Sequence, residues 1–306
     1  MKNLCRLVAG LLAITALPAL AQDYTDDQRA EAMEFAMHDA IFTLYHETGH
    51  LLVHELGLPV LGKEEDAADA LAVILILKYT DDEIERFNTL IDTADGWYFN
   101  AQNTTGEGVD DLSYYDDHSL DIQRAYAMVC MMVGADPNEF GETADIYEMD
   151  QDRQDACAGV YEQAETSWTA VLDPHFASEP GAEIPITYDD AGDYAIIEEN
   201  LKDWSVIENL AELVRTTFAL PGPVTLRATQ CGEANAYYDP STHEITYCYE
   251  LAAEMYNLYL STYDEGDEEG MTSEDDEGAA AAGAENDESG DDEGVDRKYT
   301  AGSKGG

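Results

Sequence analysis

Two histidines four residues apart, His46 and His50, are the residues of this sequence best suited to metal chemistry. On a helix, residues four apart lie on one face, so both imidazoles can present a nitrogen to one point. Glu47 follows His46 directly, and its carboxylate can take a proton from a water molecule held at that point. An ordinary helix that carries two histidines by chance is the plain alternative. The chain has only 7 histidines, however, and a glutamate in this position favours a metal site.

Residues 46–50 read His-Glu-Thr-Gly-His, the HExxH pattern of zinc hydrolases. A catalytic zinc site has three protein ligands and one open position. One class of these sites, the metzincins, takes a third histidine from the position where this chain has Leu56, so that class is excluded. His54 lies on the same straight helix, and three ligands one turn apart cannot all converge on one ion. The third ligand is therefore expected from the carboxylates that begin the next helix, Glu64 or Glu65.

Residues 65–69 read Glu-Asp-Ala-Ala-Asp, which resembles the ExxAD and ExxxD elements of zincins whose third ligand is a glutamate. The resemblance implies that Glu65 binds the metal and that Asp69 holds a ligand imidazole in one tautomer. Small side chains at Ala67 and Ala68 suit this arrangement because they allow two helices to approach closely. Glu64 stays open as the alternative ligand. A patch of negative charge at a helix N-terminus is the simplest explanation of the whole acidic cluster.

Three segments share their residue patterns with one bacterial family. They are residues 45–69, residues 117–137, and residues 231–250, which begin Cys-Gly-Glu-Ala-Asn-Ala-Tyr-Tyr-Asp-Pro. In all three the chain resembles the putative metallopeptidases of the DUF4344 type. The resemblance implies a zinc cofactor and a peptide or protein substrate. In that family the Cys-Gly-Glu segment precedes the HExxH helix, whereas here it follows, so the resemblance also implies a permuted order of segments.

Hydrolysis of a peptide bond also needs a donor that stabilises the oxyanion. His118, Arg124, Tyr237 and Tyr238 are candidates by residue type and by their place in the family segments. Each has a plainer explanation. His118 can cap the following helix, Arg124 can pair with nearby acids, and the tyrosines can be core residues.

The first 21 residues have the pattern of a secretory signal. Lys2 and Arg6 give a positive start, residues 7–17 are apolar, and residues 19–21 form a small-residue cleavage site. The apolar stretch is too short for a membrane span, and no later segment is long enough either. The mature protein is therefore expected to be exported to the periplasm or the extracellular space.

Four cysteines remain once the signal is removed, which is an even number in an oxidising compartment. The simplest pairing is local, Cys130 with Cys157 and Cys231 with Cys248. Each bridge would stabilise the fold by about 2–4 kcal/mol. A four-cysteine zinc site is the rival interpretation, but the chain has no CxxC pair.

The formal net charge is −52, and part of it lies in a tail of Asp, Glu, Gly and Ala from residue 264 onward. A segment of that composition cannot bury a core, so residues 264–306 are expected to be a disordered, solubilising tail. The rest of the chain is acidic as well. Such a surface repels nucleic acid and anionic lipid, so neither is expected as a partner.

Apolar periodicity and turn residues predict a mainly helical chain. Helices are expected over residues 25–56, 63–79, 81–92, 120–133, 152–171, 194–218 and 251–263. Residues 224–228 and 244–249 are expected to be two short strands of a hairpin around a turn at residues 239–241, pinned by the Cys231–Cys248 bridge.

These elements predict an α+β, predominantly helical, zincin-like metallopeptidase fold with a small disulfide-pinned β-hairpin. Residues 22–178 are expected to form the helical catalytic region. Residues 190–263 are expected to pack back on it, where the hairpin edge could hold an extended peptide. A partial duplicate that packs elsewhere is the alternative for this second segment.

The sequence therefore predicts an exported, zinc-dependent hydrolase, most simply a peptidase, with Glu47 as general base. A non-catalytic binding protein on a zincin-like scaffold is the first alternative, but such a scaffold has no need of the glutamate. An acidic structural protein with an incidental metal site is the second, and the third-ligand helix argues against it.

Overall fold

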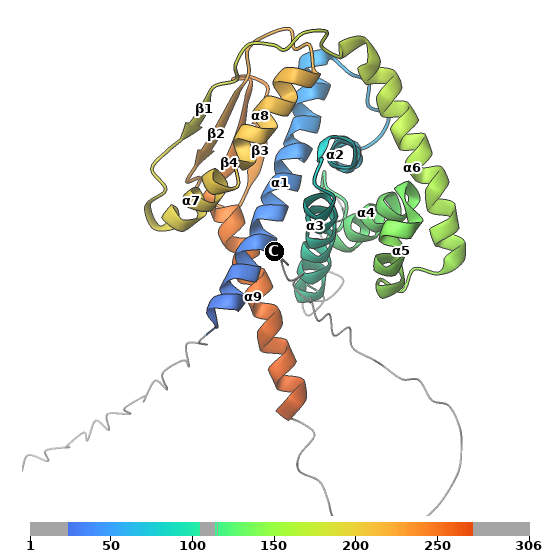
Figure 1. Cartoon of the computed structure of the whole chain (residues 1–306), viewed down its shortest axis with the longest axis vertical. Coiled ribbons are helices and arrows are strands. Elements are labelled where there is room, and N and C mark those ends of the chain that lie inside the picture. The colour runs from blue at the N-terminus through green and yellow to red at the C-terminus, as the bar shows by residue number, and fades with distance from the viewer. Residues whose placement is uncertain (1–23, 105–113, 115, 272–306) are drawn as a thin grey trace, which may run out of the picture.

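The computed structural model describes residues 24–104, 114 and 116–271. Its centre is one long helix, α1 (Asp26–Leu56), which separates a helical layer from a layer built around a small sheet (Figure 1). The predicted signal peptide and residues 272–306 of the predicted tail lie outside the described residues. The candidate metal ligands on α1 are therefore positioned between the two layers.

Local sequence explains the length of α1. Thr25 and Gln28 form a capping box at its start, in which each side chain bonds to the other's backbone. The helix ends at Gly57, whose φ of +62° is a left-handed conformation that favours glycine. Between these ends the helix has no break, and most of its middle is buried in the core. A continuous helix keeps residues four apart in register along one face.

Helices that follow α1 in the chain form the first layer. They are α2 (Glu64–Tyr79), α3 (Glu83–Thr104), α4 (Asp121–Ala135), α5 (Pro137–Ile146) and α6 (Gln151–Leu172). A disulfide between Cys130 and Cys157 joins α4 to α6. Gly134 is required at the same contact, because a Cβ there would lie 2.3 Å from the Cys157 carbonyl oxygen. This close packing fixes α4 beside α6.

The second layer is a four-stranded sheet with its helices. Its elements are β1 (Ile186–Tyr188), α7 (Ala195–Asp203), α8 (Val206–Thr217), β2 (Thr225–Thr229), β3 (Ala236–Asp239), β4 (Glu244–Cys248) and α9 (Tyr249–Met271), with short 3₁₀ turns at residues 173–175 and 192–194. The strand order is β1-β2-β4-β3. β1, β2 and β4 run parallel, and β3 is an antiparallel edge strand.

The layer of residues 190–263 packs directly on α1. Helix α9 crosses the lower end of α1 in the view of Figure 1, and α8 lies alongside α1. Strands β3 and β4 also contact α1. One apolar core runs through both layers.

The predicted fold class is confirmed: the chain is predominantly helical, with a small sheet and two disulfides. The predicted pairing of the hairpin strands is wrong. Residues 224–228 and 244–249 lie in β2 and β4, which are parallel neighbours, and β4 forms its hairpin with β3. The Cys231–Cys248 bridge joins the loop before β3 to the end of β4. The error arose because β3 has only four residues and ends directly before Pro240, so it resembled part of a turn.

Other differences concern helix boundaries. Residues 194–218 are two helices, because Ser205 adopts φ +54° between α7 and α8. Helix α9 extends to Met271, eight residues into the predicted tail, since a helix that has already formed propagates without the cost of a new nucleus. Helix α5 and strand β1 were not predicted.

Candidate metal centre

The imidazoles of His46 and His50 face the same point beside the C-terminal part of α1. Their Nε2 atoms are 3.1 Å apart. His46 is buried, and the side chain of His50 is 14% exposed, so the pair lies just below the surface. The unbroken helix holds the two rings on one face, as their four-residue spacing requires.

Helix α2 supplies the third candidate ligand from its first turn. Oε2 of Glu65 lies 3.2 Å from Nε2 of His46 and 3.2 Å from Nε2 of His50. The two helices touch at Gly49, where a Cβ would lie 3.0 Å from Cα of Ala68. The small residues at this contact allow Glu65 to reach the histidines. Three donor atoms thus form a triangle with sides of 3.1 to 3.2 Å.

The other nitrogen of each ring bonds to a carboxylate of α2. Nδ1 of His46 lies 2.7 Å from Oδ1 of Asp69, and Nδ1 of His50 lies 2.8 Å from Oε1 of Glu64. An ionised carboxylate only accepts hydrogen bonds, so both Nδ1 atoms carry a proton. In its neutral form, each ring therefore directs the lone pair of its Nε2 toward the triangle. Fixing the tautomer in this way is the usual task of a carboxylate behind a metal-binding histidine.

The donor set fits a cation. Lone pairs of two imidazoles and one carboxylate meet in the triangle, and a positive charge is needed to hold them together. Burial disfavours the charged form of His46, but its hydrogen bonds to Asp69 and Glu65 outweigh that effect and raise its pKa to about 9. A proton therefore fills this role when no other cation does. Two neutral imidazoles and a carboxylate are also a ligand set that divalent transition metals accept, so the residues fit a metal ion.

Arg124 of α4 completes a chain of contacts behind His46. Its Nε lies 2.9 Å from Oδ2 of Asp69, and one terminal nitrogen lies 2.8 Å from Oδ1. The guanidinium also stacks 4.1 Å from the centre of the Trp97 ring. Burial raises the pKa of Asp69, but the bond to His46 and the charge of Arg124 outweigh this and lower it to about 2. Arg124 thus keeps Asp69 ionised, and its guanidinium is engaged by Asp69 and Trp97.

His118 lies at the rim of the triangle. Its Nε2 is 3.0 Å from Oε2 of Glu65, and its side chain is 48% exposed. His46, Glu65 and His118 also bring one ligand atom each within 4.8 Å of one another. Nε2 of His50 lies within 3.2 Å of both other donor atoms, whereas His118 comes this close only to Glu65, so the triangle with His50 is the better-formed set. Lys63 holds the backbone beside His118 by donating to the carbonyl oxygens of Asp116 and His118.

Glu47 lies beside the donor atoms but outside the triangle. It is 6% exposed. Burial raises the pKa of its carboxyl, while the nearby charges of His46 and His50 and a hydrogen bond from the backbone of Tyr238 act in the opposite direction. A raised pKa makes a carboxylate a better proton acceptor near neutral pH.

The two candidate tyrosines of β3 lie on opposite faces of the strand. Tyr238 is buried and donates from its hydroxyl to Glu55 of α1. Tyr237 is 43% exposed and lies near Arg227 of β2, away from the triangle. The geometry therefore brings Tyr238, and not Tyr237, to the helix that carries the histidines.

Glu55, His243, Lys63 and Trp97 were not assigned to the site from the sequence. Glu55 accepts from residues more than 180 positions away, so no local pattern could reveal it. Trp97 is connected to the site through its contact with Arg124, which no sequence pattern indicates. Lys63 directly precedes the acidic first turn of α2 in the sequence. That position does not indicate which residues its side chain contacts.

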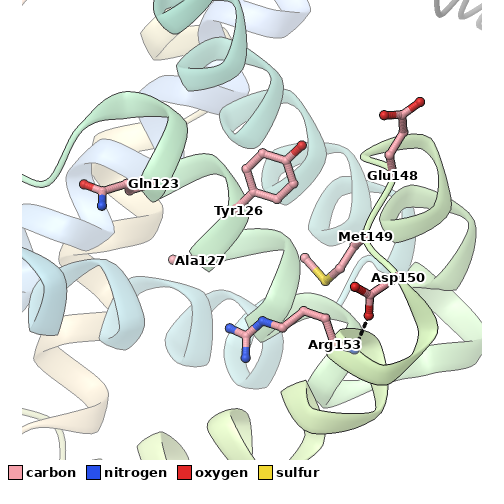
Figure 2. Close-up of a pocket in the computed structure, with 7 residues that line it drawn as sticks. All are labelled: Gln123, Tyr126, Ala127, Glu148, Met149, Asp150 and Arg153. Atoms are coloured by element: carbon pink, nitrogen blue, oxygen red, sulfur yellow. Dashed lines mark hydrogen bonds between the residues drawn. The ribbon is translucent and has the colours of Figure 1, made fainter. Parts of the chain in front are cut away.

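A separate pocket of about 410 Å³ lies on the outer side of α4 (Figure 2). Its walls are residues of α4, of the α5–α6 connection and of the first turn of α6: Gln123, Tyr126, Ala127, Glu148, Met149, Asp150 and Arg153. None of the triangle residues lines it.

Within the described residues, no helix is both long and apolar enough to cross a bilayer.

Comparison with known proteins gives one match. The model of a family described as DUF4344, putative metallopeptidase, matches residues 12–172 and 188–282. No curated protein and no solved structure matched the chain. The permuted order of segments is not tested by the match and stays a prediction. Because the two matched stretches together cover most of the sequence, and contain α1, α2 and strands β2, β3 and β4, the chain belongs to the DUF4344 family of putative metallopeptidases.

Proposed function

We propose that this protein is an exported, zinc-dependent peptidase. The family supports a metal-dependent hydrolase at the coarser level. The single observation that carries the finer proposal is the triangle formed by Nε2 of His46, Nε2 of His50 and Oε2 of Glu65, with sides of 3.1 to 3.2 Å. Two nitrogens and one oxygen at this spacing, beside a buried glutamate, are what a catalytic zinc site requires.

Zinc is the metal that best suits this triangle. A tetrahedral zinc ion with bonds of about 2.0–2.1 Å places its ligand atoms about 3.3–3.4 Å apart. The separations found here differ from that by no more than about 0.3 Å. Calcium and magnesium prefer sets of oxygen ligands, so a pair of imidazoles disfavours them. A bound zinc ion lowers the pKa of its water to about 7 and polarises a carbonyl group.

The protein's own residues have distinct tasks in this proposal. His46, His50 and Glu65 bind the metal, while Asp69 and Glu64 fix the tautomers of the two rings. Glu64 is thus assigned a supporting position and not the third ligand, because it contacts Nδ1 of His50 and not Nε2. The Glu47 carboxylate accepts a proton from the attacking water and passes it to the leaving amine nitrogen.

His118 is the residue best placed to stabilise the oxyanion. Its Nε2 reaches the edge of the triangle at Glu65, and about half of its side chain faces solvent, where a substrate arrives. The bond to Glu65 raises the pKa of His118, which favours the protonated form of the ring that can donate to an oxyanion. Arg124 and Tyr237 are directed elsewhere by their contacts.

The two layers form one catalytic unit in this proposal. Residues 22–178 supply the ligands and the base, and residues 190–263 complete the site by placing strand β3 against α1. The disulfides Cys130–Cys157 and Cys231–Cys248 suit an oxidising compartment, which supports export through the signal at residues 1–21. The acidic residues 272–306 serve to keep the exported protein soluble.

The test is cleavage of a peptide library by purified mature protein and by its Glu47→Gln variant. We expect cleavage by the wild type, no cleavage by the variant, and equal zinc content in both. Hydrolysis that survives Glu47→Gln would contradict the assigned base. A wild type that holds zinc but cleaves no peptide would favour the alternative of a binding protein.

A further inference from the structure

Strand β3 is the edge of the sheet nearest to Glu47, and its register determines where its backbone points. Tyr238 is opposite Ile245 in the antiparallel pair with β4. The backbone N–H of Cys248 donates to the carbonyl of Asn235, which makes those two residues a hydrogen-bonded pair. Bonded and non-bonded pairs alternate along such a ladder, so Tyr238 and Ile245 form a non-bonded pair. The N–H of Tyr238 is therefore free of the sheet and directed outward from its edge.

The outward N–H of Tyr238 lies near the carboxylate of Glu47, the proposed general base. The backbone of Tyr238 lies close enough to the Glu47 carboxylate for its N–H dipole to favour the ionised form, against the opposite effect of burial. Glu47 and Tyr238 are both buried at this contact. The contact joins the helix that carries the metal ligands to the edge of the sheet.

The side chain of the same tyrosine makes a second contact with α1. The Tyr238 hydroxyl donates to Oε1 of Glu55, and Nδ1 of His243 lies 2.5 Å from that oxygen. The side chain of Glu55 is only 7% exposed. Burial raises the pKa of Glu55, but the two hydrogen bonds outweigh burial and hold it below its usual value. Glu55 therefore stays ionised and accepts both bonds.

Two attachment points hold the strand more firmly than one. Glu47 and Glu55 are eight residues apart, which is about 12 Å along a helix. A strand held at both points cannot slide along α1 or rotate away from it without breaking one of them. The ring of Tyr238 also lies 6.0 Å from the ring of His54, between the two acids in the sequence.

We propose that Tyr238, anchored through its hydroxyl by Glu55, is a positioning residue that holds the Glu47 carboxylate beside the three metal-binding atoms. The inference rests on the proposed peptidase function and adds to it a role for the second layer of the fold. Tyr238 touches neither the metal nor the reacting atoms in this role. It acts by restricting the Glu47 side chain to one arrangement, and small misplacements of a catalytic group reduce rates strongly.

The test compares Tyr238→Phe with a matched control, Tyr188→Phe. Tyr188 also donates from its hydroxyl to a carboxylate, that of Glu208, at 3.1 Å, but it lies on β1 at the opposite edge of the sheet. Tyr238→Phe is expected to lower kcat about tenfold while KM changes less than about twofold, because the base is displaced and the binding surface is kept. Tyr188→Phe is expected to leave both constants unchanged. Zinc content should equal that of the wild type in each variant.

Two replacements of Glu55 distinguish a positioning role of its contact with Tyr238 from a general effect on stability. Glu55→Gln keeps an oxygen that can accept from Tyr238, whereas Glu55→Ala does not. The glutamine variant is expected to keep more of kcat than the alanine variant. Equal losses in both, or a kcat for Tyr238→Phe equal to that of the wild type, would overturn the positioning role.

Amide hydrogen exchange tests the contact between Tyr238 and Glu55 without a measurement of enzyme activity. The peptide that covers β3 is expected to exchange about tenfold faster in Tyr238→Phe than in the wild type, and to be unchanged in Tyr188→Phe. Unchanged exchange in Tyr238→Phe would overturn the anchor itself. A wild type that hydrolyses nothing would overturn the proposed function, and with it the catalytic consequence, while exchange still decides whether Tyr238 holds the strand.

Discussion

Gly49 of α1 and Ala68 of α2 are in direct backbone contact, because a Cβ at Gly49 would lie 3.0 Å from both Cα and Cβ of Ala68. Gly49 is next to His50, and Ala68 is next to Asp69. The distance between the two helices at this point therefore sets the distance between the histidines and the carboxylates of α2. A glycine at residue 49 permits the separation that the triangle of donor atoms needs.

Gly49→Ala is expected to separate the helices and weaken metal binding. The added methyl group must displace Ala68, which costs about 1–3 kcal/mol of the free energy of unfolding in a well-packed contact. Glu65 moves with α2, so zinc affinity should fall at least tenfold in a competition titration with a chelator. Gly159→Ala is the control, since nothing lies within 4 Å of a Cβ there. It should keep full zinc affinity and raise the free energy of unfolding by up to about 1 kcal/mol, as alanine does in a helix.

Arg124→Lys is expected to weaken metal binding although Arg124 is not a ligand. Lysine cannot make both bonds to Asp69 or stack on Trp97 in the same way, so Asp69 holds His46 less firmly. Loss of such a supporting contact typically reduces metal affinity about 10–100-fold. Arg86→Lys is the control, because Arg86 makes a similar pair of bonds to Glu139 away from the site. Equal zinc affinity in the two variants would show that Arg124 does not support the site.

Glu65→Ala and Glu64→Ala distinguish the two candidate third ligands. Removal of Glu65 eliminates a donor atom from the triangle, so most of the bound zinc should be lost. Removal of Glu64 eliminates the partner of His50 Nδ1, so zinc should be retained with affinity reduced about 10–100-fold at most. Elemental analysis after dialysis against metal-free buffer measures both. If Glu64→Ala is the variant that loses its metal, the ligand assignment is wrong by one residue.

Asp39, which is not one of the proposed metal ligands, is expected to make the free energy of unfolding depend on pH. It is buried on α1, and burial raises the pKa of its carboxyl to about 7, although the charge of Arg124 and the hydroxyl of Thr43 act in the opposite direction. The folded protein therefore binds more protons than the unfolded chain between about pH 4 and pH 7, so the free energy of unfolding falls as pH rises through that range. Each pKa unit corresponds to about 1.4 kcal/mol, so the total effect is about 4 kcal/mol at most.

Asp39→Asn removes this titration and keeps the shape of the side chain. The variant is expected to be more stable than the wild type at pH 8 and close to it at pH 4. Urea denaturation of both proteins at the two pH values measures the difference, and comparison of the pair cancels the titration of other groups. A difference that is the same at pH 4 and pH 8 would contradict the assigned titration of Asp39.

The sequence predicted the parts of the site that follow from local spacing. His46, Glu47 and His50 depend only on a four-residue helical period, and the unbroken α1 places them as that period requires. Glu65 and Asp69 followed from a resemblance to zincin elements, and their distances to His46 are those of bonding contacts. Local disulfide pairing was also correct for all four cysteines.

Tertiary relationships could not be obtained in the same way. The parallel pairing of β2 with β4 depends on β3, a four-residue strand with a weak pattern of its own. Tyr238 reaches Glu55 over a separation of 183 residues, which depends on how the sheet packs on α1. The direction of Arg124 toward Asp69, and not toward the open side of the triangle, depends on the packing of α4 against α2 and α6.

Metal content is the most direct test of the central claim that His46, His50 and Glu65 form a zinc site. The measurement is elemental analysis of purified mature protein, wild type and His46→Ala, after exposure to zinc and removal of the excess, with circular dichroism to confirm that both are folded. About one zinc ion per chain in the wild type, and none in folded His46→Ala, is the expected result. A folded wild type that holds no zinc after metal is added, or a His46→Ala variant that holds as much as the wild type, would contradict the account.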